Sequence, residues 1–411
     1  MNYGLIGERL GHSFSKEIHE QLGGYSYELV ELKREELEDF FKKRDFRAIN
    51  VTIPYKEAVM PFLDEIDEAA LEIGSVNTVV KVGERLIGYN TDIYGISMLF
   101  VHAGVAVRGK KAVLLGTGGT YRTSLAYLKK NGAREIISVS RTARDGIIDY
   151  RELYRSHTDA EVIINTTPVG MYPASDGCPV EVDKFPRLEG VIDVIYNPLR
   201  TELVMNARER GVRAEGGLYM LVAQAVRASE LFLGTKYPEG RLETLYNAIL
   251  SEKENIVLIG MPSSGKSTVG RVLAERLGRE LIDTDEHIVA TAGKDIPSIF
   301  AECGESGFRD VESASVSECA KRSSTVLATG GGAVLREENL RALRRTGRIY
   351  FIDRPIEKLI ATSDRPLSQT REALETRYSE RYPIYTASAD AHIDGSGTPA
   401  EVAELIIKEF L

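Results

Sequence analysis

The feature that most constrains the fold of this chain is the run GMPSSGKST at residues 260–268. It fits the pattern G-x-x-x-x-G-K-[ST], in which backbone N–H groups surround bound phosphates. Lys266 would supply a positive charge at the outer phosphates, and the hydroxyl of Ser267 can bind Mg²⁺. An apolar run at 256–259 precedes the motif and a helical pattern follows it, which is the context that phosphate binding requires. The sequence therefore predicts a parallel α/β sheet with a nucleoside triphosphate site.

Two more apolar runs lead directly into glycine-rich turns, at 112–119 and at 326–332. Short apolar runs alternate with helical patterns along the chain, which is typical of α/β layers. At 411 residues the chain is too long for one ordinary core, so two or three domains are expected. A polar stretch at 251–255 precedes the strand of the phosphate loop, and we expect a short linker there. A helix is expected over 218–233, where apolar residues share one face.

Composition excludes several classes of protein. The net charge of −9 argues against a general nucleic-acid surface, which needs a basic face. No apolar run approaches the ~18–20 residues of a membrane helix, and the start lacks the features of a signal peptide, so a cytoplasmic protein is expected. Three cysteines without metal-like spacing indicate neither a disulfide framework nor a zinc site. His12 has no suitably spaced partner ligand, and we expect it to serve in packing or capping.

Carboxylates and arginines follow the phosphate loop in the C-terminal part. Asp283 and Asp285 end a predicted strand, where one carboxylate can face Mg²⁺ while the other accepts a substrate proton. Taken alone, this D-x-D pattern is equally compatible with a solvated loop or a helix cap. Arg309 precedes Glu312 by one helical turn, which alone would suit an ordinary surface ion pair. Two further arginines each stand next to or near a proline: Arg365 and Arg381.

In order, these motifs read G-x-x-x-x-G-K-S-T, D-x-D, G-E-x-x-F-R-x-x-E, G-G-G, D-R-P-L and R-x-P-x-Y. The set closely resembles shikimate kinase over about residues 255–411, which implies a P-loop parallel-sheet domain like that of nucleoside monophosphate kinases. The resemblance implies that Asp285 is the base for the substrate's 3-hydroxyl, that Ser267 and Asp283 serve Mg²⁺, and that Arg365 lies on a lid over ATP. It also implies that shikimate is bound by Asp285, Arg309, Gly331 and Arg381. The residues implied to contact ATP are Ser263, Ser264, Gly265, Lys266, Ser267, Thr268 and Arg365.

Two positions depart from this family's pattern. Ser263 stands where the family usually has a loop glycine, so a positive φ at this position would strain the turn. The stretch 359–363 lacks the arginine that commonly lies along the adenine. Both departures concern nucleotide affinity, since the groups implied to carry phosphoryl transfer are all present.

The N-terminal glycine turn follows the G-x-G-x-x-G fingerprint only in part, because Tyr121 takes the third position, where a small residue normally allows close packing. The next predicted strand, 136–139, runs into Ser140, Arg141, Thr142 and Arg144. An NAD site usually has a carboxylate here, whereas two arginines and a hydroxyl suit the 2′-phosphate of NADP. The alternative is that these arginines belong to a solvated strand end.

Upstream of this turn lie polar groups that can recognise a polyhydroxylated ring. The run 50–56 reads as a strand that ends at Lys56, and Asn77 and Asp92 follow in later runs. Lys56 beside Asp92 would form a proton-transfer pair, in which the ammonium protonates an oxygen whose carbon receives hydride. Ser13 and Ser15 offer two hydroxyls, although a helix N-cap would explain them equally well.

The ordered motifs H-S-x-S, N-V-T-x-P-x-K, V-N-T, N-T-D, G-x-G-G, N-T-T-P-V-G-M, Y-N-P and M-L-V-A-Q resemble shikimate dehydrogenase over about residues 1–250. The resemblance implies a substrate-binding domain at 1–93 and 218–250 and a Rossmann NADP-binding domain at 94–217. Implied substrate contacts are Ser13, Ser15, Thr52, Lys56, Asn77, Asp92, Tyr196 and Gln224. Implied cofactor contacts are Gly116, Thr117, Gly118, Gly119, Thr120, Ser140, Arg141, Thr142, Arg144, Val194 and Gly217.

Taken together, the two resemblances imply a bifunctional enzyme that uses NADP(H), ATP and Mg²⁺. It would reduce 3-dehydroshikimate to shikimate and then phosphorylate shikimate at the new 3-hydroxyl. One alternative is a dehydrogenase that acts on quinate or accepts NAD. Another is that one half is a non-catalytic ligand sensor. The expected partners are small-molecule substrates rather than nucleic acid or membrane, and both a monomer and a homodimer are compatible with the sequence.

Overall fold

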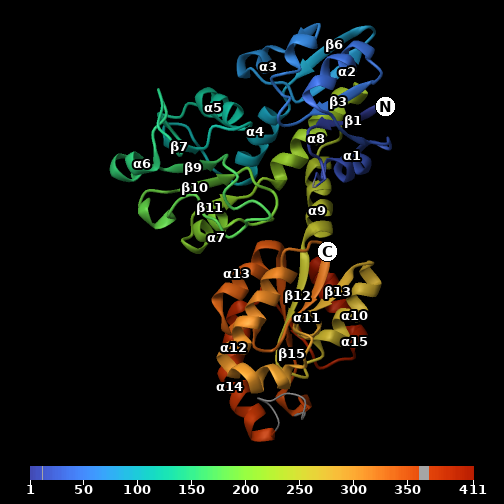
Figure 1. Cartoon of the computed structure of the whole chain (residues 1–411), viewed down its shortest axis with the longest axis vertical. Helices are drawn as coiled ribbons and strands as arrows, with labels where there is room; N and C mark the ends of the chain where they lie inside the picture. Colours follow the sequence, from blue (N-terminus) through green and yellow to red (C-terminus); the bar gives the residue numbers. More distant parts are fainter. Residues whose placement is uncertain (12, 361–369) are drawn as a thin grey trace. The chain divides into compact units, whose positions relative to one another are not determined.

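The computed structural model describes residues 1–11, 13–360 and 370–411. It divides the chain into two compact units, Met1–Ile249 and Leu250–Leu411, and both are built from α/β layers as predicted (Figure 1). The boundary falls inside helix α9 (Arg241–Lys253), so the expected linker at 251–255 is wrong. The polar residues there continue the helix, with the N–H of Glu254 donating to the carbonyl of Leu250 at 2.8 Å, and Asn255 already begins the next strand.

The N-terminal unit opens with a six-stranded mixed sheet in the order β2-β1-β3-β5-β6-β4. Strands β1, β2 and β3 are parallel, whereas β5 runs antiparallel to both β3 and β6. The expected strand at 50–56 is shorter than predicted, because β3 ends at Val51 and Lys56 lies in the following turn. The strands are β1 (Tyr3–Gly7), β2 (Glu28–Glu31), β3 (Ala48–Val51), β4 (Glu65–Ile66), β5 (Thr78–Val82) and β6 (Arg85–Tyr89).

The second sheet of this unit is fully parallel, in the order β11-β10-β9-β7-β8. The chain leaves β7, forms β8 on one side and then returns to form β9 on the other. This reversal of direction creates the crevice at which doubly wound sheets bind ligands. The strands are β7 (Lys111–Leu115), β8 (Glu135–Val139), β9 (Val162–Asn165), β10 (Gly190–Asp193) and β11 (Arg213–Glu215).

The C-terminal unit has one parallel sheet in the order β13-β14-β12-β15-β16, seen edge-on in Figure 1. Residues alternate between its two faces: Val257 and Ile259 pack in one apolar cluster with Val316 and Leu343, while Ile256 belongs to the opposite cluster. Burial on both faces explains why the strands read as continuous apolar runs. The strands are β12 (Asn255–Ile259), β13 (Glu280–Asp283), β14 (Thr325–Ala328), β15 (Gly347–Asp353) and β16 (Ala391–Asp394).

The helices cover these sheets and carry several of the predicted site residues. The helix expected at 218–233 is confirmed as α8, which packs against α4 and α1. Helix α12 is interrupted at Gly304, whose φ of 68° leaves the helical range. No helix in the described part of the chain is long and apolar enough to cross a membrane. In addition to α9, the helices are α1 (Ser15–Gly23), α2 (Leu37–Lys43), α3 (Glu68–Ile73), α4 (Asp92–His102), α5 (Tyr121–Lys130), α6 (Tyr150–Ser156), α7 (Glu202–Glu209), α8 (Leu218–Leu233), α10 (Lys266–Leu277), α11 (Thr284–Ala292), α12 (Ile296–Cys319), α13 (Glu337–Thr346), α14 (Arg371–Ser388) and α15 (Pro399–Phe410).

Candidate active sites

The structure brings Lys56 and Asp92 together in the N-terminal unit. The ammonium of Lys56 lies 2.6 Å from Oδ2 of Asp92, and both side chains are largely buried, at 16% and 10% exposure. Asp92 is the first residue of α4. The amide of Asn77 donates to the other carboxylate oxygen at 2.9 Å. The three side chains form one polar cluster in which the carboxylate orients the lysine.

A buried hydrogen-bond network holds the side chains of this cluster in place. The N–H of Thr91 donates to Oδ1 of Asn77 at 2.7 Å, which directs the amide NH₂ group toward Asp92. Asn50 donates to the hydroxyl of Thr78 at 3.0 Å, and Tyr27 donates to Asn50 at 2.7 Å. Buried polar groups need such partners, because an unsatisfied group costs about 1–3 kcal/mol. Sequence reasoning missed Tyr27, since nothing local links it to residues so far along the chain.

Other predicted substrate residues lie at the start of α1 and after β10. Ser13 and Ser15 lie at the start of α1, where the N–H of Ser15 donates to the hydroxyl of Ser13 at 3.3 Å. Phe14 holds the N-cap position, so neither serine is the N-cap residue. The ring of Phe14 contacts that of Tyr196, with centroids 5.3 Å apart.

Two more of these residues lie on other elements of the same unit. Gln224 on α8 lies 3.4 Å from the hydroxyl of Thr91, next to Asp92. Thr52 directly follows β3, and its N–H donates to the carbonyl of Ile6 at 3.0 Å. His12 lies outside the described residues.

The glycine turn after β7 is built for close approach. Gly116 has a φ of 91°, and a Cβ there would lie 2.8 Å from the side chain of Thr167. Tyr121 begins α5, and its hydroxyl lies 2.9 Å from that of Ser138 on β8. The ring therefore reaches across to the neighbouring strand, whereas the fingerprint expects a small residue here.

The remaining residues predicted to contact the cofactor follow three strands of this sheet, β8, β10 and β11. Beyond β8, Arg141 and Arg144 are exposed. Val194 directly follows β10, and Gly217, two residues beyond β11, packs so tightly on the backbone of Val194 that a Cβ would overlap its carbonyl group. Gly217 is therefore a position where only glycine fits.

Asp193 at the end of β10 holds the loop that carries Val194 and Tyr196. Its carboxylate accepts hydrogen bonds from the N–H of Ile195 at 3.1 Å, from the amide of Asn165 at 3.0 Å and from the hydroxyl of Thr201 at 2.7 Å. Complete burial raises the pKa of Asp193 to about 6, although these three bonds oppose the shift. Sequence reasoning did not single out this residue.

The phosphate loop of the C-terminal unit follows β12, as predicted. Ser263 has a φ of 65°, in the left-handed region that disfavours residues with a side chain. Its hydroxyl donates to the carbonyl of Ile360 at 2.9 Å. Lys266 donates to the loop carbonyls of Gly260 and Met261 at 2.9 Å each. The loop thus has the predicted conformation, with a strained serine in place of a glycine.

The sequence left open whether Asp283 caps a helix or faces Mg²⁺. Its two carboxylate oxygens make contacts that suit each of these roles. Its Oδ1 caps α11 by accepting the N–H groups of Asp285 at 3.0 Å and Glu286 at 3.4 Å. Its Oδ2 accepts a hydrogen bond of 2.6 Å from the hydroxyl of Ser267. Hydroxyl and carboxylate oxygens are ligands that suit Mg²⁺, directly or through water. The pair therefore fits the metal site implied by the sequence.

Arg309 forms a buried ion pair with Glu312, so the alternative of a surface ion pair is wrong: the two side chains are 10% and 1% exposed. Burial raises the pKa of Glu312 even beside this arginine. The arginine fills the space next to Gly332, where a Cβ would overlap the guanidinium. Similarly, a Cβ on Gly330 would lie 2.5 Å from Oδ1 of Asp285. Gly330 and Gly332 of the glycine triplet after β14 therefore leave room for the side chains of Asp285 and Arg309.

A cavity of about 590 Å³ brings these groups together. On its wall, Arg381 donates to the carbonyl of Gly331 at 2.9 Å. Ser264 does not line it, and Arg365 lies outside the described residues. Apolar rings of Phe300 and Phe308, stacked 4.4 Å apart, were not predicted to belong to the site. The predicted residues that do line the cavity are Ser263, Gly265, Lys266, Ser267, Thr268, Asp283, Asp285, Arg309, Gly331 and Arg381.

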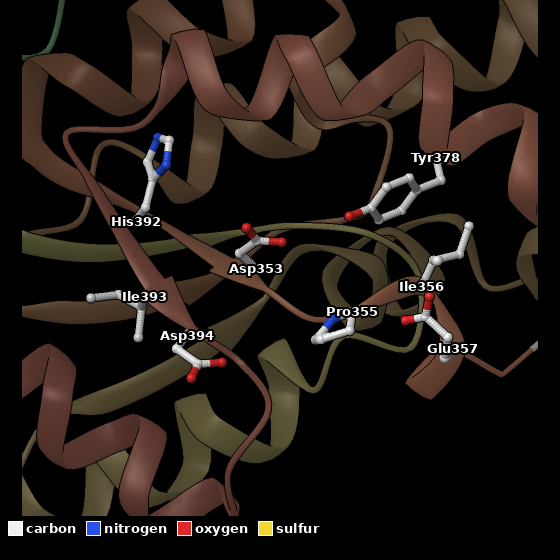
Figure 2. A pocket seen from close by; sticks show the side chains of 8 residues that line it. All are labelled: Asp353, Pro355, Ile356, Glu357, Tyr378, His392, Ile393 and Asp394. Carbon is white, nitrogen blue, oxygen red and sulfur yellow. The ribbon is translucent and has the colours of Figure 1, made fainter.

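A second hollow, of about 440 Å³, lies at the ends of β15 and β16 (Figure 2). The carboxylates of Asp353, Glu357 and Asp394 and the ring of Tyr378 line it. None of the site residues predicted from the sequence belongs to it. Asp353 accepts a hydrogen bond of 2.8 Å from the hydroxyl of Tyr382, which ties this strand end to α14.

Comparison with known proteins shows which family each unit resembles. Residues 5–79 match the family model of the shikimate dehydrogenase substrate binding domain, and residues 262–411 match that of shikimate kinase. A shikimate dehydrogenase (NADP(+)) of Clostridium beijerinckii is 35% identical over 267 residues, which are 61% of this chain and 98% of that protein.

Two solved structures resemble the same part of the chain. A shikimate 5-dehydrogenase from Thermus thermophilus, in complex with NADP(H) and shikimate, is 29% identical with a TM-score of 0.54 and covers 60% of this chain and 99% of its own. A quinate dehydrogenase from Corynebacterium glutamicum, in complex with NAD, is 28% identical with a TM-score of 0.54 and covers 61% of this chain and 99% of its own. The chain belongs to the shikimate dehydrogenase family through its N-terminal unit, and a shikimate kinase domain is fused behind it.

Proposed function

We propose that this chain is a bifunctional enzyme that reduces 3-dehydroshikimate with NADPH and then phosphorylates the resulting shikimate with Mg·ATP. One observation carries the proposal: each unit assembles its own polar site, Lys56 with Asp92 in one and Lys266 with Asp285 in the other. The first reaction creates a 3-hydroxyl, and the second consumes that same oxygen. Because phosphorylation by ATP is strongly favourable, it would draw the reversible reduction toward product.

In the reduction, Lys56 is the proton donor. Bound NADPH would supply the hydride for carbon 3 of the ketone. The ammonium of Lys56 would give its proton to the carbonyl oxygen, which becomes the 3-hydroxyl of the product. Asp92 holds the ammonium 2.6 Å away and fixes its direction. The other groups proposed to hold the substrate are Ser13, Ser15, Thr52, Asn77, Tyr196 and Gln224.

We assign the cofactor to the carboxyl end of β7. The turn from Gly116 to Thr120 would lie along the pyrophosphate, while Val194 and Gly217 would face the nicotinamide. Ser140, Arg141, Thr142 and Arg144 would surround the 2′-phosphate, and the exposed guanidinium groups support this assignment. Strand membership supports a substrate lobe of residues 1–93 and 218–250 and a cofactor lobe of residues 94–217, since each sheet takes its strands from one lobe.

In the phosphorylation, Asp285 would accept the proton of the 3-hydroxyl as that oxygen attacks the γ-phosphorus, while the bond from the γ-phosphorus to the bridging oxygen breaks and ADP leaves. Lys266 would stabilise negative charge on the phosphates, and Ser267 and Asp283 would hold Mg²⁺. Ser263, Ser264, Gly265 and Thr268 complete the ATP site, and Arg365 would cover it. Arg309 and Arg381 would bind the substrate carboxylate, which matches the guanidinium group, with Gly331 beside them.

The test gives the purified protein 3-dehydroshikimate, NADPH and Mg·ATP, and assays shikimate and shikimate 3-phosphate. We expect the 3-phosphate to accumulate, and we expect shikimate itself when ATP is omitted. If shikimate formed but was never phosphorylated, the kinase half of the proposal would be wrong. No turnover by either half would favour the alternative of a ligand sensor.

A quinate-specific, NAD-dependent enzyme is the second candidate, and the likeness to the quinate dehydrogenase favours it. Two pairs of residues support the first assignment instead. The hydroxyls of Ser13 and Ser15 favour shikimate, and the guanidinium groups of Arg141 and Arg144 favour NADP. Steady-state kinetics with shikimate and quinate, each with NADP⁺ and NAD⁺, decides between the two. A higher kcat/KM for quinate with NAD⁺ would overturn our assignment.

We place the enzyme in the cytoplasm, where NADPH and ATP are both supplied, and its three free cysteines suit that reducing compartment. The proposed partners are small molecules only, without nucleic acid or membrane. Each site is built from one copy of the chain, so a monomer and a homodimer would both be competent.

A further inference from the structure

Arg377 is a residue of the kinase cavity that sequence analysis did not predict. It lies on α14, four residues before Arg381, and residues at this spacing share one face of a helix. Both arginines line the cavity of about 590 Å³, together with Arg309 from α12. Three guanidinium groups from two helices therefore converge on the substrate side of this site.

The three arginines differ in how they are held. Arg309 pairs with the buried carboxylate of Glu312 and lies 3.5 Å from Glu305. Arg381 donates to the carbonyl of Gly331 at 2.9 Å. Within the described part of the chain, Arg377 has no carboxylate at ion-pair distance and no hydrogen-bond partner, although its side chain is partly buried. Arg377 is thus free to bind a ligand that enters the cavity.

The electrostatics of the cavity also favour an anion next to Arg377. Burial, followed by the charges of Arg381 and Arg309, lowers the pKa of Arg377, while Glu305 and Glu380 oppose that shift. Glu312 neutralises one of the three cations on this wall and leaves two. A bound carboxylate would relieve the remaining repulsion, and its two oxygens have about four acceptor positions, enough for more than two arginines.

We propose that Arg377 is a third arginine that binds the substrate carboxylate in the kinase site, beside Arg309 and Arg381. This inference rests on the proposed kinase function of the C-terminal unit. It makes Arg377 a specificity residue that favours acids over neutral analogues, without a part in phosphoryl transfer itself.

The experiment compares Arg377→Gln with wild type in the full-length protein, using shikimate and its uncharged methyl ester as substrates. We expect the KM for shikimate to rise by about tenfold, as for the loss of one charge-assisted hydrogen bond, with kcat and the KM for ATP within twofold. The KM for the ester should not change. Added salt should raise the KM for shikimate more in wild type than in the variant. Salt screens the attraction between Arg377 and the substrate carboxylate, and the variant no longer has that attraction.

Two further variants make the result specific. Arg377→Lys keeps the charge and should recover part of the affinity for shikimate. Arg271→Gln removes the same charge from an exposed position on α10 outside the cavity, and it should leave all constants unchanged. An unchanged KM ratio of acid to ester in Arg377→Gln would overturn the inference, as would a fall in kcat at constant KM. If wild type does not phosphorylate shikimate at all, the proposed function fails instead.

Discussion

Asp193 shows how one buried side chain can tie stability to pH. It is fully buried at the end of β10, and its carboxylate accepts hydrogen bonds from Ile195 in the following loop, from Asn165 at the end of β9 and from Thr201 at the start of α7. Burial raises its pKa from 3.8 to about 6, so between these values the folded chain keeps a proton that the unfolded chain has released. The free energy of unfolding must therefore fall as pH rises through this range.

We predict that Asp193→Asn removes this dependence. Because one pKa unit corresponds to about 1.4 kcal/mol, the wild type should lose about 3 kcal/mol relative to the variant between pH 4 and pH 7. The measurement is calorimetric unfolding of both proteins at several pH values, with the C-terminal unit as the internal control. A constant difference between the two proteins over this range would show that Asp193 does not titrate as inferred.

Single residues also show where sequence reasoning reaches its limit. Lys266 and Asp283 could be placed because a local motif fixes their surroundings, and the positive φ of Ser263 followed from the glycine that it replaces. Arg377 could not be placed, since an arginine among Glu and Arg residues on a helix normally faces solvent. The Tyr27 network was equally out of reach, because its partners come from strands that are distant in the sequence.

At the scale of elements, helices α4 and α8 define the dehydrogenase site by packing closely. Asp92 begins α4 and Gln224 lies on α8, so the distance between the helices sets the distance between these side chains. Gly95 makes the close approach possible, because a Cβ there would lie 2.7 Å from the carbonyl of Met220 and 3.1 Å from the Cβ of Gln224. The sequence predicted α8 with the right bounds, but it could not show which helix packs against it.

We predict that Gly95→Val separates the two helices. Overpacking of this kind costs about 1–3 kcal/mol, and the shift should lower the kcat/KM of the reduction by at least tenfold. Val101→Ala, at an exposed position of the same helix, serves as the control and should change neither quantity. For both variants, kcat/KM is measured by dehydrogenase kinetics and the change in stability by thermal unfolding. Full activity in a Gly95→Val protein would mean that the helix spacing does not position Asp92 and Gln224.

At the scale of the whole molecule, each of the two units contains its own set of the side chains predicted for one reaction. Strand ends followed by glycine turns made both sets predictable, since carboxyl ends of parallel strands share one edge of a sheet. The boundary between the units was harder to predict. Ser251 to Lys253 look like a linker by composition, yet they are good enough helix formers to continue α9.

Independent sites predict independent losses of activity. Lys56→Ala should abolish the NADPH-dependent reduction, because no proton donor remains beside Asp92, and it should spare phosphorylation of added shikimate. Lys266→Ala should have the opposite effect, because the phosphates lose their point charge. Both activities are measured on each purified variant, so the retained activity reports that the chain is folded. If either substitution abolished both activities in a chain that is still folded by circular dichroism, the two sites would have to be coupled, and the fusion would serve regulation as well as supply of substrate.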